Sequence, residues 1–223
     1  MATGIPPKNS NKRKKIPVSI SYAGKEPEES IISQTGINFE TVLPVNGSGK
    51  NMLFYGDNFD ALLYLLNNGY KGRISLIYID PPFATASNFI NRKLEHAYSD
   101  ALCGGEYVEF LRERLILMRE LLADNGSIYL HLDSKMAFTM KLIMDELFGE
   151  DNCRAFITRK KCSTKNYTKN TFGNVSDYIM FYSKGSEYTW NRPYDPWEMD
   201  RMIEEYPYID ESTGKRYKKV PVH

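Results

Sequence analysis

The sequence predicts an α/β fold with a mainly parallel β-sheet. Strand-like and helix-like segments alternate from residue 51 onward, and one of the strand-like segments is apolar at nearly every position. The 223 residues suit one large domain, and an apolar content of 42% is sufficient for a sizeable core. We therefore expect a layered fold in which helices cover a central sheet.

The first predicted unit comprises residues 52–79. Residues 52–55 are apolar and predict a short strand, and the leucines of residues 59–66 recur at helical spacing. Residues 74–79 read ISLIYI, a nearly continuous apolar run that is typical of a strand buried on both faces of a parallel sheet. A strand, a helix and a strand within about thirty residues predict a βαβ unit.

The alternation continues after a polar stretch at residues 84–105. Apolar residues recur at helical spacing in two further segments and form short runs in three others. We expect helices over residues 106–123 and 135–148, and strands over residues 127–132, 154–158 and 178–182. This rhythm ends near residue 190, beyond which the chain is rich in aromatic residues, prolines and acids.

Composition excludes several classes of protein. No run approaches the roughly 20 apolar residues that cross a bilayer, and the first twenty residues lack the apolar core of a secretory signal. Three cysteines without CxxC spacing argue against a disulfide scaffold and a structural zinc site. The three histidines form no metal-binding pattern. We therefore expect a cytoplasmic protein that has no membrane segment and binds no metal.

The motif Asp80-Pro81-Pro82-Phe83 directly follows the predicted buried strand. Ligands of open α/β sheets bind outside the carboxyl ends of the strands. The two prolines fix the backbone and lack N–H donors, so the Asp80 carboxylate and the nearby carbonyls act as acceptors at one rigid place. Phe83 adds a flat apolar surface. Acceptors beside an aromatic ring suit a planar group that carries an exocyclic NH₂.

Such a site suits methylation of an amino group. Two acceptors on the NH₂ hydrogens draw the nitrogen lone pair out of conjugation with the ring, and the nitrogen can then attack an electrophilic methyl group. The proton leaves afterwards, so no strong base is required before the attack. An aromatic side chain holds the base by stacking, which contributes roughly 1–3 kcal/mol in comparable contacts. A base in a duplex must first be flipped out of the stack.

Together with residues 55–58, which read YGDN, this motif resembles the S-adenosylmethionine-dependent DNA amino-methyltransferases. More narrowly, it is similar to the permuted β group, which includes the Mod subunits of type III restriction–modification systems. Further similar segments are residues 110–115, 126–133, 144–149 and 176–184. The resemblance covers about residues 50–220 and implies a Rossmann-like methyltransferase fold, incomplete at the C-terminus.

The resemblance implies a role for each residue of the Asp80 motif. Asp80 and the carbonyl of Pro81 would hold the target amino group, with Pro82 in the same rigid turn, and Phe83 would stack on the flipped base. Aspartate in the first position favours adenine N6 as the target, whereas serine there is usual for cytosine N4. We therefore expect catalytic roles for Asp80, Pro81, Pro82 and Phe83 in a DNA adenine-N6 methyltransferase.

For the cofactor, S-adenosylmethionine, the resemblance implies Gly56, Asp57 and Asp80 as binding residues, with Asp57 accepting from the adenine amino group of the cofactor. The family also uses a Phe-x-Gly-x-Gly turn after a strand, and no such turn occurs in the sequence. We therefore expect that a second polypeptide, or a missing C-terminal part, supplies this turn and target recognition.

The net charge of +1 conceals an uneven distribution. Six basic residues occur within residues 154–169, and no acid occurs between Asp151 and Asp177. Asparagines, serines and threonines are interleaved, which suits a loop that contacts phosphates. With the resemblance, this predicts DNA contacts, the alternative being a solvated loop. The predicted DNA-binding residues are Arg159, Lys160, Lys161, Lys165 and Lys169.

These observations divide the chain into three parts. Residues 1–50 are interpreted as a basic, largely irregular and mobile segment. Residues 51–190 are interpreted as the catalytic methyltransferase core, and residues 191–223 as the start of a target-recognition region. His131 is expected to be a packed core residue, and Asp133 a possible supporting residue at a strand end.

The expected function is DNA adenine-N6 methylation in a prokaryotic cytoplasm, within restriction–modification or epigenetic marking. Two alternatives stay open. One is amino methylation of RNA or of a protein amide, for which related motifs usually begin with asparagine. The other is a non-catalytic DNA-binding remnant or subunit, because the glycine turn is missing.

Overall fold

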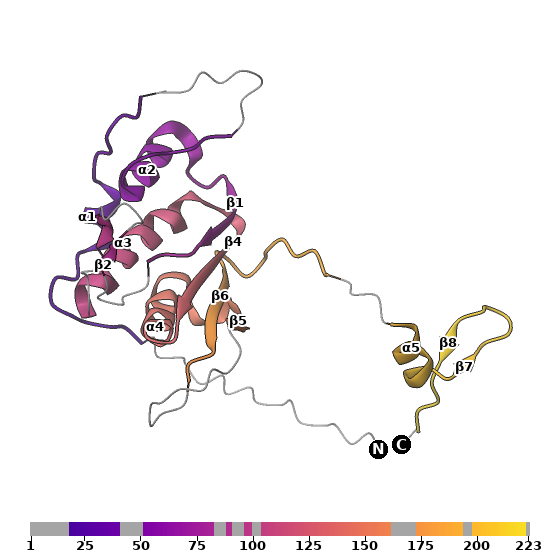
Figure 1. Ribbon diagram of the computed structural model, residues 1–223. Coiled ribbons are helices and arrows are strands. Elements are labelled where there is room, and N and C mark those ends of the chain that lie inside the picture. The colour runs from indigo at the N-terminus through magenta and orange to yellow at the C-terminus, as the bar shows by residue number, and fades with distance from the viewer. Residues whose placement is uncertain are drawn as a thin grey trace, which may run out of the picture. The chain divides into compact units, whose positions relative to one another are not determined.

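The computed structural model describes residues 18–40, 51–82, 88–90, 96–99, 104–161, 173–193 and 198–221 (Figure 1). The chain forms two compact units, Met1–Thr189 and Trp190–His223. The first unit holds the main sheet and helices α1 to α4, and the second holds helix α5 and a short hairpin.

The main sheet contains four strands within the described ranges, in the order β1-β4-β6-β5. They are β1 (Ile74–Ile79), β4 (Leu122–Asp133), β5 (Cys153–Lys160) and β6 (Ser176–Ser183). β1 and β4 pair in parallel, whereas β6 pairs antiparallel with both of its neighbours. β1, β4 and β5 therefore run in the same direction, and the predicted α/β fold with a mainly parallel sheet is confirmed. β6 is the reversed strand, and it lies between β4 and β5.

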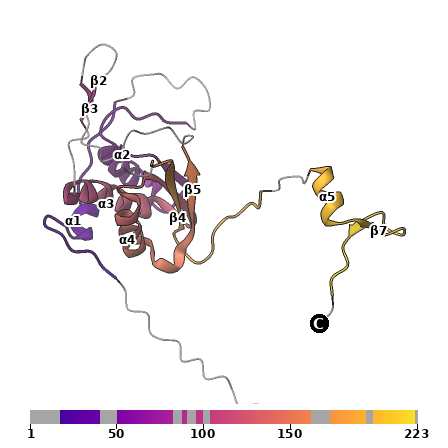
Figure 2. The ribbon, with the colours of Figure 1, turned by 60° about the horizontal axis from the view of Figure 1, so that its bottom comes forward.

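The helices of the first unit lie on one side of this sheet. α3 (Gly104–Leu121) and α4 (Ala137–Phe148) lie beside it in both views, and α2 (Asn58–Leu65) packs against α3 (Figure 2). Each fully buried apolar side chain contributes about 1.5–3 kcal/mol. The fully buried core includes Leu115, Ile116, Leu117, Ile128, Leu130, Leu132, Met140, Ile143, Met144, Met180 and Tyr182.

The predicted helices over 106–123 and 135–148 and the predicted strands over 127–132, 154–158 and 178–182 are confirmed as α3, α4, β4, β5 and β6. The helix predicted over 59–66 is α2, and a π-helical turn, η1 (Leu66–Tyr70), follows it. Gly69 in that turn adopts a φ of 81°, which only glycine accepts readily, and the helix ends there. A short 3-10 helix, η2 (Glu150–Asn152), leads from α4 into β5.

β1 packs against the core on one face only, and its residues there are partly buried, which corrects the prediction of burial on both faces. Ile77 and Ile79 pack against the core, whereas Leu76 and Tyr78 are 60% and 56% exposed. Alternate residues of a strand point to opposite faces of the sheet. The described helices cover the face of Ile77 and Ile79, so the face of Leu76 and Tyr78 is open.

The strand predicted over residues 52–55 is wrong. The structure gives this segment no regular secondary structure, and the side chains of Leu53 and Tyr55 are 94% and 99% exposed. The ring of Phe54 instead packs edge-on against Phe39 and Tyr64, with centroid distances of 5.1 and 5.7 Å. The apolar character of the segment thus reflects an aromatic cluster and not a strand.

The mobile segment predicted for residues 1–50 is wrong for its described part. Helix α1 (Glu28–Ile32) packs against α3 and buries the side chain of Ile31 completely. The Glu146 carboxylate on α4 accepts from the backbone N–H of Ile20 at 3.0 Å and from Nζ of Lys25 at 2.5 Å. Burial opposes ionisation of Glu146, but these hydrogen bonds outweigh it and lower the pKa of the carboxyl below its usual range. Residues 18–40 are therefore part of the folded unit.

Two small hairpins complete the described structure. β2 (Asn88–Ile90) and β3 (His96–Ser99) pair antiparallel, as do β7 (Tyr208–Ile209) and β8 (Arg216–Tyr217). α5 (Met199–Glu205) precedes β7. None of the helices in the described ranges has the length and apolar character that a bilayer crossing requires. Within the same ranges, no three His, Cys, Asp or Glu side chains gather as a metal site.

Candidate active site

Asp80 lies at the carboxyl end of β1, beside the central strand β4. The register of the parallel pair aligns Ile79 with Leu130, so the next residues, Asp80 and His131, are neighbours. Oδ1 of Asp80 lies 3.3 Å from Nδ1 of His131. The side chain of Asp80 is 55% exposed and that of His131 only 9%. Asp80 can therefore meet a substrate, while His131 is fixed behind it.

The two prolines after Asp80 are half-buried, and α3 anchors them. The hydroxyl of Tyr107, near the start of α3, donates to the carbonyl of Pro82 at 2.8 Å. Tyr107 is 3% exposed, so the helix core holds the donor in place. Sequence reasoning missed Tyr107, because nothing in a helical sequence marks a tyrosine that reaches a distant carbonyl. Phe83, the fourth residue of the motif, lies outside the described residues.

Asp57 caps helix α2 and pairs with a buried arginine. Its Oδ1 accepts from the backbone N–H of Phe59 at 2.8 Å and from Nη2 of Arg114 at 2.9 Å. Asp57 is 57% exposed, whereas Arg114 is 6% exposed and lies 3.6 Å from the ring centre of Phe110. Arg114 therefore fixes an aspartate whose carboxylate still reaches solvent. Sequence reasoning missed Arg114, which looked like one more charge on an amphipathic helix.

Gly56, the other predicted cofactor residue, precedes this cap. It adopts a φ of 153°, and a Cβ at this position would lie 3.4 Å from the ring of Phe39. A side chain here would therefore meet both backbone strain and a close aromatic neighbour. The glycine lets the chain turn sharply into α2, so that Asp57 stands at the helix N-terminus.

A third carboxylate, Asp177, lies at the start of β6 and was missed. Its Oδ2 lies 3.8 Å from Nε2 of His131, and its Oδ1 accepts from Nζ of Lys161 at 3.0 Å. Nη1 of Arg159 lies 3.5 Å from Oδ2. Two of the predicted DNA-binding residues therefore surround a buried carboxylate. Only the pairing of β6 with β4 and β5 brings these groups together, and that pairing is not visible in the sequence.

The remaining predicted residues divide as follows. Lys160 is exposed at the end of β5. Lys165 and Lys169 lie outside the described residues. Oδ1 of Asp133 accepts from the backbone N–H groups of Lys135 and Met136, at 3.0 and 3.4 Å, and shapes the turn into α4.

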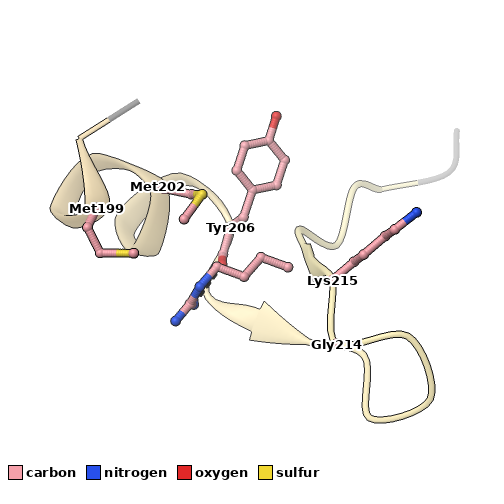
Figure 3. A pocket seen from close by; sticks show the side chains of 6 residues that line it. Met199, Met202, Tyr206, Gly214 and Lys215 are labelled. Atoms are coloured by element: carbon pink, nitrogen blue, oxygen red, sulfur yellow. Dashed lines mark hydrogen bonds between the residues drawn. The ribbon is translucent and has the colours of Figure 1, made fainter. Parts of the chain in front are cut away.

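A hollow of about 660 Å³ lies in the second unit, away from these groups in the sequence (Figure 3). It is formed by α5 and by the β7–β8 hairpin. Figure 3 shows two methionines of α5 on one side and Lys215 of the hairpin on the other. The lining residues are Met199, Met202, Tyr206, Gly214, Lys215 and Arg216.

Comparison with known families decides the class of the chain. A family model described as DNA methylase matches residues 74–220, which include Asp80, Asp177 and all four strands of the main sheet. The chain belongs to the DNA methylase family. The predicted family resemblance is confirmed.

Curated relatives of this chain are methyltransferases and Mod subunits. The type II methyltransferase M.EcaI of Enterobacter cloacae is 44% identical over 92% of this chain and 46% of its own length. The type III StyLTI Mod subunit of Salmonella typhimurium is 31% identical over 73% of this chain and 28% of its own length. The chain therefore spans about half the length of M.EcaI and less of the Mod subunit.

Two solved structures are similar to this chain. A complex of M1.HpyAVI with SAM aligns with a TM-score of 0.42 at 15% identity, over 65% of this chain and 60% of that one. The cytosine-N4-specific PvuII DNA methyltransferase aligns with a TM-score of 0.42 at 19% identity, over 57% of this chain and 48% of that one.

Proposed function

We propose that this chain is the catalytic part of a site-specific DNA methyltransferase that methylates adenine N6. The observation that carries the proposal is the exposed carboxylate of Asp80, held at the carboxyl end of β1 by the anchored prolines and by His131. Membership of the DNA methylase family supports DNA as the substrate. An aspartate at the head of the motif supports adenine over cytosine.

Asp80 would act on the amino group of a base flipped into the site. Its carboxylate and the Pro81 carbonyl accept the two N6 hydrogens, which directs the nitrogen lone pair out of the ring plane. S-adenosylmethionine would supply the methyl group to this nitrogen and would keep the electron pair of the methyl–sulfur bond on its sulfur. The nitrogen then loses one proton to the Asp80 carboxylate. Phe83 would stack on the base during these steps.

The described residues fit the adenosine end of S-adenosylmethionine. When bound, this cofactor supplies the electrophilic methyl group. Asp57 has a half-exposed carboxylate, which Arg114 and the α2 N-terminus hold in one orientation, and this suits an acceptor for the cofactor's adenine amino group. Gly56 allows close approach beside it. The residues that would bind the methionine end are not among those described.

We infer that a further segment packs on the exposed face of β1 and pairs with its free edge. Leu76 and Tyr78 are exposed there, and β1 is at the edge of the sheet. An edge strand presents unpaired backbone groups, which another strand can satisfy. Since relatives are about twice as long or longer, the rest of a longer chain or a second polypeptide would supply this segment, the glycine turn and the methionine-end contacts.

The second unit would begin the target-recognition region. It is a compact unit of its own and carries a basic cluster that would face phosphates. Nζ of Lys219 lies 4.5 Å from the ring centre of Tyr208, and Nζ of Lys218 lies 5.5 Å from that of Tyr206. The basic cluster comprises Lys215, Arg216, Lys218 and Lys219.

The test measures methylated bases directly. The chain is incubated, alone and with the polypeptide that supplies the glycine turn, with DNA and methyl-labelled S-adenosylmethionine, and the digested nucleosides are analysed by mass spectrometry. We expect N6-methyladenine from the combination and a loss of at least about 100-fold in Asp80→Ala. Asp124→Ala is the control, because Asp124 is a fully exposed carboxylate at the opposite end of β4.

Each other outcome corrects a stated part of the proposal. N4-methylcytosine as the product would replace adenine as the target. Strong turnover by the chain alone would refute the need for a further segment. Methylation by Asp80→Ala at the wild-type rate would remove Asp80 from the mechanism.

A further inference from the structure

A row of polar side chains leads from Asp80 into the sheet. Oδ1 of Asp80 lies 3.3 Å from Nδ1 of His131, and Nε2 of His131 lies 3.8 Å from Oδ2 of Asp177. The hydroxyl of Tyr78 lies 3.4 Å from the same Nδ1. The imidazole thus stands between two carboxylates that come from different strands, β1 and β6.

Exposure falls steeply along this row. The side chain of Asp80 is 55% exposed, that of His131 is 9% exposed, and that of Asp177 is 6% exposed. A half-exposed aspartate can change its rotamer freely unless a neighbour holds it. A buried imidazole on a central strand has no such freedom, because packing fixes it. His131 can therefore restrict the rotamer of the Asp80 side chain.

Asp177 is kept at the back of the imidazole by two cations. Nζ of Lys161 lies 3.0 Å from its Oδ1, and Nη1 of Arg159 lies 3.5 Å from its Oδ2. A buried carboxylate is tolerated only when it is paired in this way. The cations belong to the end of β5, so three adjacent strands of the sheet contribute to one arrangement around His131.

We propose that His131 is a positioning residue for Asp80, with Asp177 orienting the imidazole. The proposal rests on the proposed function, because the orientation of Asp80 matters only if its carboxylate holds the target amino group. In this arrangement His131 would carry a proton on Nδ1 and donate it to Oδ1 of Asp80, which would fix one rotamer and leave Oδ2 for the amino hydrogen, with the Tyr78 hydroxyl as a second neighbour of the same nitrogen. Misplacement of an acceptor by about 1 Å can lower the rate about 100-fold, so a fixed Asp80 rotamer would raise the rate of methyl transfer.

The contact itself can be tested without methylation. In NMR spectra of the ¹⁵N-histidine-labelled chain, we expect an Nδ1 proton of His131 that is protected from exchange; His131→Asn assigns it against His96 and His223. The signal should disappear in Asp80→Ala and survive in Asp80→Asn, whose amide oxygen still accepts. An unchanged signal in Asp80→Ala would overturn the proposal.

The kinetic test uses the chain combined with the segment that completes the enzyme. We expect His131→Leu to lower kcat by about 10- to 100-fold with little change in KM for DNA. His131→Asn should recover most of this loss, because its amide nitrogen can donate from near the position of Nδ1. Asp124→Asn, a fully exposed position at the opposite end of the same strand, is the control, and thermal unfolding verifies that each variant folds.

The outcomes separate this proposal from the proposed function. Equal losses in His131→Leu and His131→Asn, or a rise in KM with kcat unchanged, would overturn the positioning role. A wild-type enzyme that makes no N6-methyladenine while the NMR signal responds to Asp80→Ala would instead refute the proposed function and leave the contact in place.

Discussion

Replacement of Ile31 by alanine tests whether the N-terminal segment is part of the fold. Ile31 is completely buried where α1 packs against α3, although α1 has only five residues. The substitution removes three carbon atoms at roughly 0.8 kcal/mol each, which gives about 2.4 kcal/mol. The partly collapsed cavity raises the expected loss to about 3 kcal/mol.

The measurement is urea unfolding at equilibrium, followed by far-ultraviolet circular dichroism, because both tryptophans of the chain lie in the second unit and do not report on the unit that holds Ile31. Ile37→Ala is the matched control, because Ile37 is in the same N-terminal segment but is 55% exposed, and it should change the free energy of unfolding by less than about 0.5 kcal/mol. Similar values for the two variants would refute the reasoning and would restore the interpretation of this segment as a mobile leader.

Two further predictions concern acid and salt. Because the folded pKa of Glu146 is lowered, its contribution to stability is present above its ordinary pKa of 4.5 and is lost as the pH falls through its folded value. Glu146→Gln should therefore lower the free energy of unfolding at neutral pH and approach the wild-type value in acid, and Lys25→Met should change the pH dependence in the same direction; a constant difference between variant and wild type across the acid range would contradict this. Lys160→Ala should weaken DNA binding by the completed enzyme and reduce the slope of log K against log salt by about 0.9, as expected for one phosphate contact. Lys71→Ala, at the other end of the sheet, should leave that slope unchanged, and an equal slope for both variants would argue against a DNA contact at Lys160.

The sequence was sufficient for the elements whose signals are local. The apolar run before Asp80 predicts β1, and the helical spacing of leucines and methionines predicts α3 and α4, because burial against one neighbour is enough to produce these patterns. The same reasoning failed at residues 52–55. A short apolar segment has no period that separates a strand from a turn, and here the ring of Phe54 packs edge-on against the rings of Phe39 and Tyr64.

The candidate site was predictable only where its residues are consecutive in the sequence. Asp80 and its prolines form one motif, whereas Asp177 enters the site through the insertion of β6 between β4 and β5. His131 was correctly expected to be buried, but its contact with Asp80 depends on the β1–β4 register. A histidine within an apolar strand carries no sign of the residue that will lie beside it on the next strand.

The reversed direction of β6 also determines where the chain can vary. β5 ends and β6 begins at the same end of the sheet as Asp80, so the connection between these two strands starts and finishes at that end. The pairing of β5 and β6 with their neighbours uses no residue of this connection. Protein engineers who wish to alter what approaches Asp80, while keeping the sheet that holds it, therefore have a natural grafting point.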